Sequence, residues 1–188
     1  MTDLLPKRAD AERNRKKILA AAAELFANSE GEVSMAEVAR LADVGMATLY
    51  RNFPGRMDLL EALFTDEVDT ICESASAASG ESPGALLSSW LHRFHGFSMS
   101  KRRVALEILK HTDTNDPLFG GSRSKVLSVG RPMLNAAQKA GEIREDLVLE
   151  QVLDMVVAIA TINGPPAYVE PILDAAIDGL RVCSNPDV

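Results

Sequence analysis

Apolar residues recur along most of this chain at intervals of three and four positions, and this spacing restricts the fold more than any other feature. Over 9–28 the repeat is carried by Ile18, Ala21, Ala22, Leu25 and Phe26. Such spacing places apolar side chains on one face of an α-helix, whereas a half-buried strand needs strict alternation. Strand-like alternation is nearly absent from the 188 residues. The pattern therefore predicts an all-α fold.

Two short helices are predicted after this first one. Ser34 and Glu37 have the spacing of a capping box, in which two side chains satisfy free amide groups at a helix start. The helix that begins there is expected to end near Leu41, because 42–45 has the composition of a turn. A second short helix follows and stops at 53–55. The result is a predicted three-helix unit over the N-terminal part of the chain.

Longer helices are predicted from residue 56 onward. The apolar repeat places them at about 56–77, 83–97, 104–109, 126–137, 152–159 and 172–180. The segment 113–121 is rich in Gly, Pro and Asn and is expected to be a loop. The sequence thus predicts about nine helices, with a three-helix unit over 1–55 and a larger helical bundle over 56–188.

Charge is distributed unevenly between these two parts. The net charge of the whole chain is -7, to which the first 56 residues contribute +1 and the remainder -8. Six cations fall within 7–17, namely Lys7, Arg8, Arg13, Arg15, Lys16 and Lys17. Such an end attracts polyanions, although the same pattern is typical of the solvated face of a helix. A second basic run, 101–103, is expected to be a solvated helix start, with recognition of an acidic effector as the alternative.

Composition excludes several classes of protein. With 46% hydrophobic and 25% charged residues, the chain has the make-up of an average globular protein. Its two cysteines, Cys72 and Cys183, have no ligand or redox spacing, so neither a disulfide framework nor a Cys-based zinc site is expected. No apolar stretch reaches the length of a signal sequence or a membrane helix. These features fit a reducing, cytoplasmic setting.

The N-terminal unit has the layout of a helix-turn-helix module, whose second short helix enters the major groove of DNA. The predicted outward residues of that helix are Thr48, Tyr50 and Arg51. Hydroxyl, phenol and guanidinium groups can bond phosphates or base edges. An ordinary helical corner with polar residues facing water would show the same layout, so this pattern leaves both interpretations open.

A denser motif overlaps the same unit. Residues 33–60 read VSMAEVARLADVGMATLYRNFPGRMDLL and follow the helix ILAAAAELF at 18–26. The run T-L-Y-R-x-F-x-x-R-x-x-L-L within it resembles the tetracycline-repressor (TetR) family of bacterial transcription regulators. The resemblance covers roughly 12–62, and for the remainder of the chain it depends on the number and order of helices.

This resemblance implies a DNA-binding set, which consists of Ser34, Gly45, Met46, Ala47, Thr48, Tyr50, Arg51, Asn52 and Arg56. Ser34 would cap its helix near a phosphate, and Arg56 stands where the family usually has a Lys that clamps the DNA backbone. The chain departs from the family at Asp43, usually Gly, and at Gly45, usually Ser or Thr. Asp tolerates left-handed backbone geometry and Gly is an acceptable N-cap, so the motif is retained.

The resemblance also implies a homodimer whose two recognition helices lie about 34–36 Å apart on a near-palindromic operator. The last two helices are the expected dimer face. Their apolar residues are Val152, Met155, Val156, Ile159, Ala160, Ile172, Leu173, Ala176, Ile177 and Leu180. The alternative is that this surface is the core of a single chain.

A small-molecule pocket within the bundle is a further implication of the family. The candidate lining is Phe64, Trp90, Phe94, Phe97, Leu106, Leu109, Met133 and Met155. This apolar and aromatic set, with polarizable sulfur atoms, is typical of a pocket for an apolar effector. The same residue types at helical spacing are also typical of a plain core.

Catalysis and metal binding find no support. His92 and His95 lie three apart on one predicted helix, but no nearby carboxylates or thiolates complete a ligand set, so neither a metal nor another cofactor is expected. No nucleophile and base pair appears, and we do not expect an enzyme. The sequence predicts a repressor released from its operator by a small apolar molecule. The alternative is a DNA-bound interaction or architectural protein of the same fold without an effector.

Overall fold

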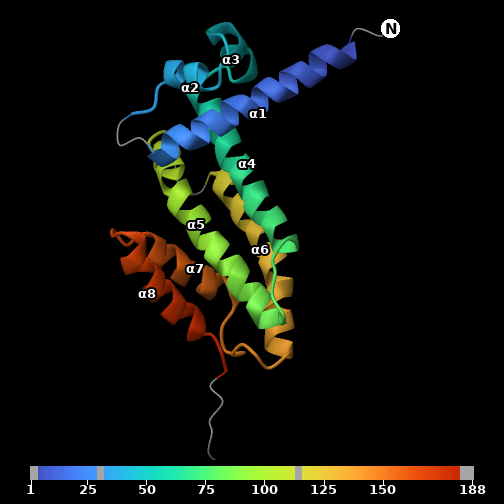
Figure 1. Ribbon diagram of the computed structural model, residues 1–188, viewed down its shortest axis with the longest axis vertical. Coiled ribbons are helices and arrows are strands. Elements are labelled where there is room, and N and C mark those ends of the chain that lie inside the picture. The colour runs from blue at the N-terminus through green and yellow to red at the C-terminus, as the bar shows by residue number, and fades with distance from the viewer. Residues whose placement is uncertain (1–3, 29–31, 113–115, 183–188) are drawn as a thin grey trace, which may run out of the picture. The chain divides into compact units, whose positions relative to one another are not determined.

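The structure, a computed structural model, describes residues 4–28, 32–112 and 116–182, and these ranges contain eight α-helices and no sheet (Figure 1). The helices are α1 (Leu4–Asn28), α2 (Met35–Leu41), α3 (Met46–Asn52), α4 (Arg56–Ser76), α5 (Pro83–Leu109), α6 (Pro117–Lys139), α7 (Leu149–Ala160) and α8 (Pro166–Asp178). The predicted all-α fold is confirmed. The helix count is one lower than expected because α5 is continuous. Residues 98–103 contain neither Gly nor Pro, so nothing interrupts its backbone hydrogen bonds.

The chain packs as two compact units. Unit 1 combines residues 1–66 with 100–114, and unit 2 combines 67–99 with 115–188. Helices α4 and α5 each contribute residues to both. The predicted division of function at residues 55 and 56 stays a prediction.

The core of unit 1 is built by the apolar face of α1 and by one or two residues from each short helix. Ile18 and Phe26 of α1, Val38 of α2 and Leu49 of α3 are each no more than 3% exposed. Helix α1 begins at Leu4, five residues before the predicted start. The spacing of its apolar residues therefore positions α2 and α3 against a single long helix.

Unit 2 is organised around Trp90 of α5, which is fully buried. Its indole Nε1 donates a hydrogen bond of 3.3 Å to the carbonyl of Ile71 in α4. Helix α7 packs against both α6 and α8.

The start of α6 differs from the prediction of a loop over 113–121. Because Asp116 caps α6 and Pro117 is its first residue, the chain is helical from 117 onward, and 113–115 lie outside the described residues. Helix α6 ends at Lys139, and Gly141, near which the helix was predicted to stop, follows with a left-handed φ of 70°.

A search of the described residues for a helix long and apolar enough to cross a lipid bilayer finds none.

Candidate nucleic-acid interface

The start of α2 is fixed by the predicted capping box. The Ser34 hydroxyl accepts a hydrogen bond of 3.2 Å from the Glu37 amide, and a Glu37 carboxylate oxygen accepts bonds of 2.8 Å from both the amide and the hydroxyl of Ser34. These bonds hold the pKa of Glu37 below its usual range. Both hydrogen-bonding roles of the Ser34 hydroxyl are thereby used within the cap. Its predicted position near a phosphate stays a prediction.

The turn between α2 and α3 depends on Asp43. It has a φ of 53° and is the one residue other than Gly with a positive φ in the described ranges. The Asp43 amide donates to the Arg40 carbonyl at 3.3 Å, and the Val44 amide donates to the Ala39 carbonyl at 3.0 Å. This pair of bonds is a Schellman motif, which needs a left-handed residue at the position of Asp43. Asp43 therefore adopts the left-handed conformation at a position where the family usually has Gly.

Helix α3 is held by two buried side chains. Leu49 is 0% exposed, and Phe53, which ends the helix, is 1% exposed. Gly45 stands at the N-cap without a side-chain hydrogen bond. Anchored at Leu49 and Phe53, the short helix turns the rest of its surface away from the core.

The outward surface of α3 contains four of the nine predicted DNA-binding residues. Met46 is 40% and Tyr50 47% exposed, and Ala47 and Arg51 are exposed as well. These positions recur at three and four residues, so they share one side of the helix. A helix with a buried anchor and an exposed strip of this composition can enter a DNA groove.

Thr48 and Asn52 are half-buried and bond within α3. The Arg51 guanidinium donates a hydrogen bond of 3.0 Å to the Thr48 hydroxyl, and the Asn52 amide donates one of 2.8 Å to the Thr48 carbonyl. Arg51 is thus oriented before any DNA binds. The Asn52 side chain stabilises the C-terminal turn of α3 through its bond to the Thr48 carbonyl.

Arg56, at the start of α4, contacts three separated segments of unit 1, two by hydrogen bonds and one through an aromatic ring. Its Nη1 donates to the Val33 carbonyl, and its Nη2 lies 3.5 Å from a carboxylate oxygen of Glu107 in α5. The guanidinium carbon lies 5.8 Å from the centre of the Phe26 ring. Bonds from Lys110 and from Arg56 hold the pKa of Glu107 below its usual range. The predicted phosphate role of Arg56 stays a prediction, and the side chain already serves as a brace.

The basic run at 101–103 is not uniformly solvated. Lys101 is only 4% exposed, whereas Arg102 is exposed. Burial lowers the pKa of Lys101 to about 7, against the opposing influence of Asp66. Arg103 donates a hydrogen bond of 3.2 Å to the Phe26 carbonyl at the end of α1. The expectation of a solvated helix start was wrong, because the run lies inside α5 and Lys101 is buried.

The predicted effector-binding residues are divided between the two units. Phe64 is buried and Leu109 half-buried in unit 1, where Leu106 is 51% exposed and faces solvent. In unit 2, Trp90, Phe94 and Phe97 form a row along α5, with ring centres 5.8 Å and 5.7 Å apart. Met133 and Met155 are half-buried in the same unit. The described contacts bring together the three aromatic residues of α5.

His95 follows Phe94 on α5 but projects about 100° away from it around the helix, so it lies on a neighbouring side of α5 and not in the aromatic row; it was not predicted to bind a ligand. It is 7% exposed, and its Nε2 has no hydrogen-bond partner among the described residues. Burial lowers the pKa of this imidazole, which favours its neutral form. A buried polar atom without a partner is costly, and a bound molecule can satisfy it.

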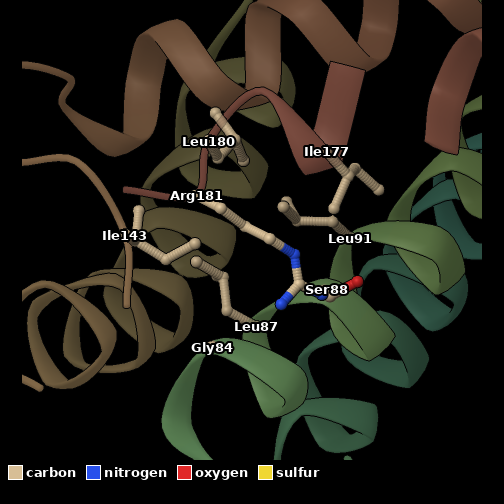
Figure 2. A pocket seen from close by; sticks show the side chains of 8 residues that line it. All are labelled: Gly84, Leu87, Ser88, Leu91, Ile143, Ile177, Leu180 and Arg181. Atoms are coloured by element: carbon tan, nitrogen blue, oxygen red, sulfur yellow. The ribbon is translucent and has the colours of Figure 1, made fainter. Parts of the chain in front are cut away.

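A cavity in unit 2 lies away from these aromatic residues. Leu87 and Leu91 of α5 line one side, and Ile143, Ile177 and Leu180 line the other (Figure 2). Figure 2 shows the Arg181 side chain running across the space toward Ser88. The volume is about 10 Å³, which is room for one water molecule. Ligand pockets usually measure about 300–1,000 Å³, so this cavity is not an effector site.

The apolar residues of the last two helices are mostly core. Of the ten expected at a dimer face, seven are buried within the chain itself, namely Val152, Val156, Ile159, Ala160, Leu173, Ile177 and Leu180. The exposed side of α7 instead carries Val157 (43% exposed) and Ala158, and that of α8 carries Tyr168 (59% exposed) and Ala175. A dimer face on these helices would have to use this second set.

Comparison with known proteins identifies the family of both regions. Residues 18–63 match the family described as "Bacterial regulatory proteins, tetR family", and residues 82–182 match "Transcriptional regulator SbtR-like, C-terminal domain". A search of curated proteins gives no match.

Solved structures agree with this result. A TetR transcriptional regulator from Streptomyces coelicolor is 34% identical, with a TM-score of 0.77 over 90% of this chain and 99% of that one. A TetR transcription regulatory protein from Mycobacterium vanbaalenii is 30% identical, with a TM-score of 0.75 over 94% of this chain and 100% of that one. GusR from Salmonella enterica, at 20% identity and a TM-score of 0.61, shares the fold, and the two chains cover 96% and 97% of each other.

Regulators of this family are DNA-binding transcription factors without enzymatic activity, and they act as dimers on operators. The exposed α3 surface, the Schellman turn before it and both family matches lead to one conclusion. The chain belongs to the TetR family and is a DNA-binding transcription regulator.

Proposed function

We propose that this regulator is a repressor whose homodimer binds a near-palindromic operator and leaves it when a small, largely apolar molecule binds in unit 2. The observation that carries the DNA-binding part is the exposed strip of α3, anchored from below by Leu49 and Phe53. A protein that acts on an operator in this way works in the bacterial cytoplasm. Occupation of a promoter by such a dimer would exclude the transcription machinery.

The chemistry of the α3 strip suggests a role for each residue. Arg51 and Tyr50 can donate hydrogen bonds to phosphates or base edges, and the planar guanidinium suits guanine. Met46 and Ala47 are apolar and can contact thymine methyl groups. Because Arg51 is already oriented by Thr48 at 3.0 Å, binding restricts its side chain less than it would restrict a free one.

We assign the dimer face to the exposed sides of α7 and α8. Val157 and Ala158 lie one turn before Thr161, and Tyr168 and Ala175 lie two turns apart, so each helix presents a strip of small and apolar side chains. A face of this kind suits close packing of two helix pairs. Replacement of Val157 and Tyr168 by Glu should give monomers in sedimentation experiments, whereas Glu at exposed Asn135 of α6, outside the proposed face, should not.

The proposed effector site is the aromatic row of α5, extended to His95 on the neighbouring side of the same helix. Three rings supply apolar contact, and the unpartnered Nε2 of His95 supplies one hydrogen-bonding position. The effector class that fits is an apolar molecule with a single polar group. To release DNA, it must favour the non-binding geometry, typically by about 1–3 kcal/mol.

Gel-shift titration tests the DNA-binding surface. The probe is duplex DNA from the region upstream of the protein's own gene, and the variants are Arg51→Ala and Tyr50→Ala. We expect each to weaken binding at least tenfold, since contacts to base edges are typically worth about 1–3 kcal/mol. Arg93→Ala, an exposed cation on α5, is the matched control and should bind like the wild type. Equal binding by all four proteins would refute the assignment of α3.

Thermal-shift screening against a metabolite library tests the effector. A ligand at 100 times its Kd stabilises the folded state by about 2.7 kcal/mol and should release DNA in the same titration. His95→Phe keeps an aromatic ring but removes the polar atom, so it should weaken binding of the effector with little effect on DNA affinity. A library that never moves the melting temperature would favour the alternative, an architectural protein of this fold that binds DNA and takes no effector.

A further inference from the structure

The basic end of α1 lies outside the region that identifies the family. The match to the DNA-binding family begins at residue 18, whereas the six cations of the N-terminal cluster fall at 7–17. Only two acidic residues, Asp10 and Glu12, occur in the same span. Helix α1 nevertheless includes all of it, because the helix begins at Leu4.

This segment has little apolar surface. Its two apolar residues are Ala9 and Ala11, which cannot form the broad apolar face that an interfacial membrane helix needs. The same lack of large apolar side chains disfavours a partner helix. A highly charged, slender polyanion is the ligand that suits the segment best.

Contacts within unit 1 place these cations next to the recognition helix. The Arg15 guanidinium lies 4.5 Å from the centre of the Phe53 ring, and Phe53 ends α3. The neighbouring Lys16 and Lys17 are exposed and form no ion pair with the described residues, whereas Arg13 is paired with Asp10. Figure 1 shows α1 continuing past α3 toward its N-terminal end.

We propose that the basic segment of α1, residues 10–17, is a second DNA-binding surface, which holds phosphates beside the groove that α3 occupies. The inference rests on the proposed function, since it needs α3 to dock on a duplex. It assigns Lys16 and Lys17 as sequence-independent contacts, in contrast to the base-reading role of α3. Neutralising a phosphate releases condensed counterions, so such contacts increase affinity for any duplex and make it depend on salt.

The test is fluorescence anisotropy with the full-length protein at about 50–200 mM KCl, the range over which phosphate contacts change affinity most visibly. Two duplexes of equal length are compared, one from the upstream region and one of unrelated sequence. Lys16→Gln/Lys17→Gln is the test variant. Arg93→Gln/Lys139→Gln, two exposed cations of unit 2, removes the same charge elsewhere and is the control. Circular dichroism verifies that both variants fold.

We expect the test variant to bind both duplexes at least tenfold more weakly. Its slope of log K against log salt should fall by about 0.9 for each phosphate that the variant no longer neutralises, or about 2–4 for two cations in one or both subunits. The control should stay within about twofold of the wild type on both duplexes, because its cations lie outside the proposed surface.

Equal reductions in affinity for the two double variants would overturn the inference, because they would reflect net charge alone. It is also overturned if the test variant keeps the wild-type slope while Arg51→Ala no longer binds the upstream duplex, and that result leaves the proposed function intact. A wild-type protein that binds neither duplex would contradict the proposed function itself.

Discussion

Replacement of Arg56 by Gln distinguishes a brace within unit 1 from a clamp on the DNA backbone. The structure gives the guanidinium a charge-assisted bond to the Val33 carbonyl, a contact to Glu107 and a position over the Phe26 ring. Gln is too short to reach all three and carries no charge. If the main role of Arg56 is to make these contacts within unit 1, the variant should have a lower free energy of unfolding than the wild type.

The size of the effect follows from each contact. A hydrogen bond from a charged donor is worth about 1.5–3 kcal/mol. The pair with Glu107 is partly exposed, with side chains 27% and 24% accessible, so it adds about 0.2–1 kcal/mol. The ring contact at 5.8 Å adds about 0.5–1 kcal/mol. Because contacts of one side chain are not additive, we expect the free energy of unfolding to fall by about 2–3 kcal/mol.

Thermal unfolding by circular dichroism and DNA titration across salt concentrations measure the two roles separately. For a chain of this length, the expected destabilisation lowers the melting temperature by about 5–10 °C. The salt slope of DNA binding should not change. Arg56→Lys keeps the charge but not the forked geometry, so it should recover part of the stability at most.

The opposite pattern would refute this reasoning. A melting temperature within about 1–2 °C of the wild type, together with a salt slope reduced by about 0.9 per subunit, would identify Arg56 as a phosphate clamp. Arg56→Lys would then bind DNA like the wild type.

Three further predictions concern packing and protonation. A Cβ added at Gly130 would lie 2.6 Å from the Trp90 ring, so Gly130→Ala should lower the free energy of unfolding by about 1–3 kcal/mol in urea, and an unchanged midpoint would contradict this packing. Burial lowers the pKa of Lys101 to about 7, and the unfolded chain binds a proton there up to about pH 10.5. Wild-type stability should therefore rise between about pH 7 and 10 relative to Lys101→Met, and parallel curves in urea titrations would refute the effect. Both ring nitrogens of His92 lie 2.8 Å from oxygens, of Asp174 and of the Ser88 carbonyl, which favours the charged imidazole. Burial lowers the pKa of His92, but these bonds outweigh it and the net shift is upward. The stability that His92→Gln removes should be largest below about pH 6.5 and should vanish as pH rises through the raised pKa; a destabilisation independent of pH would argue against it.

The local features of the DNA-binding unit were predictable from sequence. The capping box of Ser34 and Glu37 joins residues three apart, and the left-handed turn at Asp43 depends on a few neighbouring backbone groups. The motif from Thr48 to Leu60 is equally contiguous. Each depends on spacing along one stretch of chain, which is why sequence alone determined the start of α2, the turn before α3, the reading helix and the family.

Tertiary structure decided what lies opposite each side chain. The partner of Arg56 is Glu107, 51 positions away, and nothing in the basic run at 101–103 shows that its first member is buried. Likewise, periodicity identified the apolar faces of α7 and α8 but not which neighbour covers them, and seven of the ten expected dimer residues proved to be core. Helical spacing fixes which side of a helix is apolar, whereas burial depends on distant segments that only the folded chain brings together.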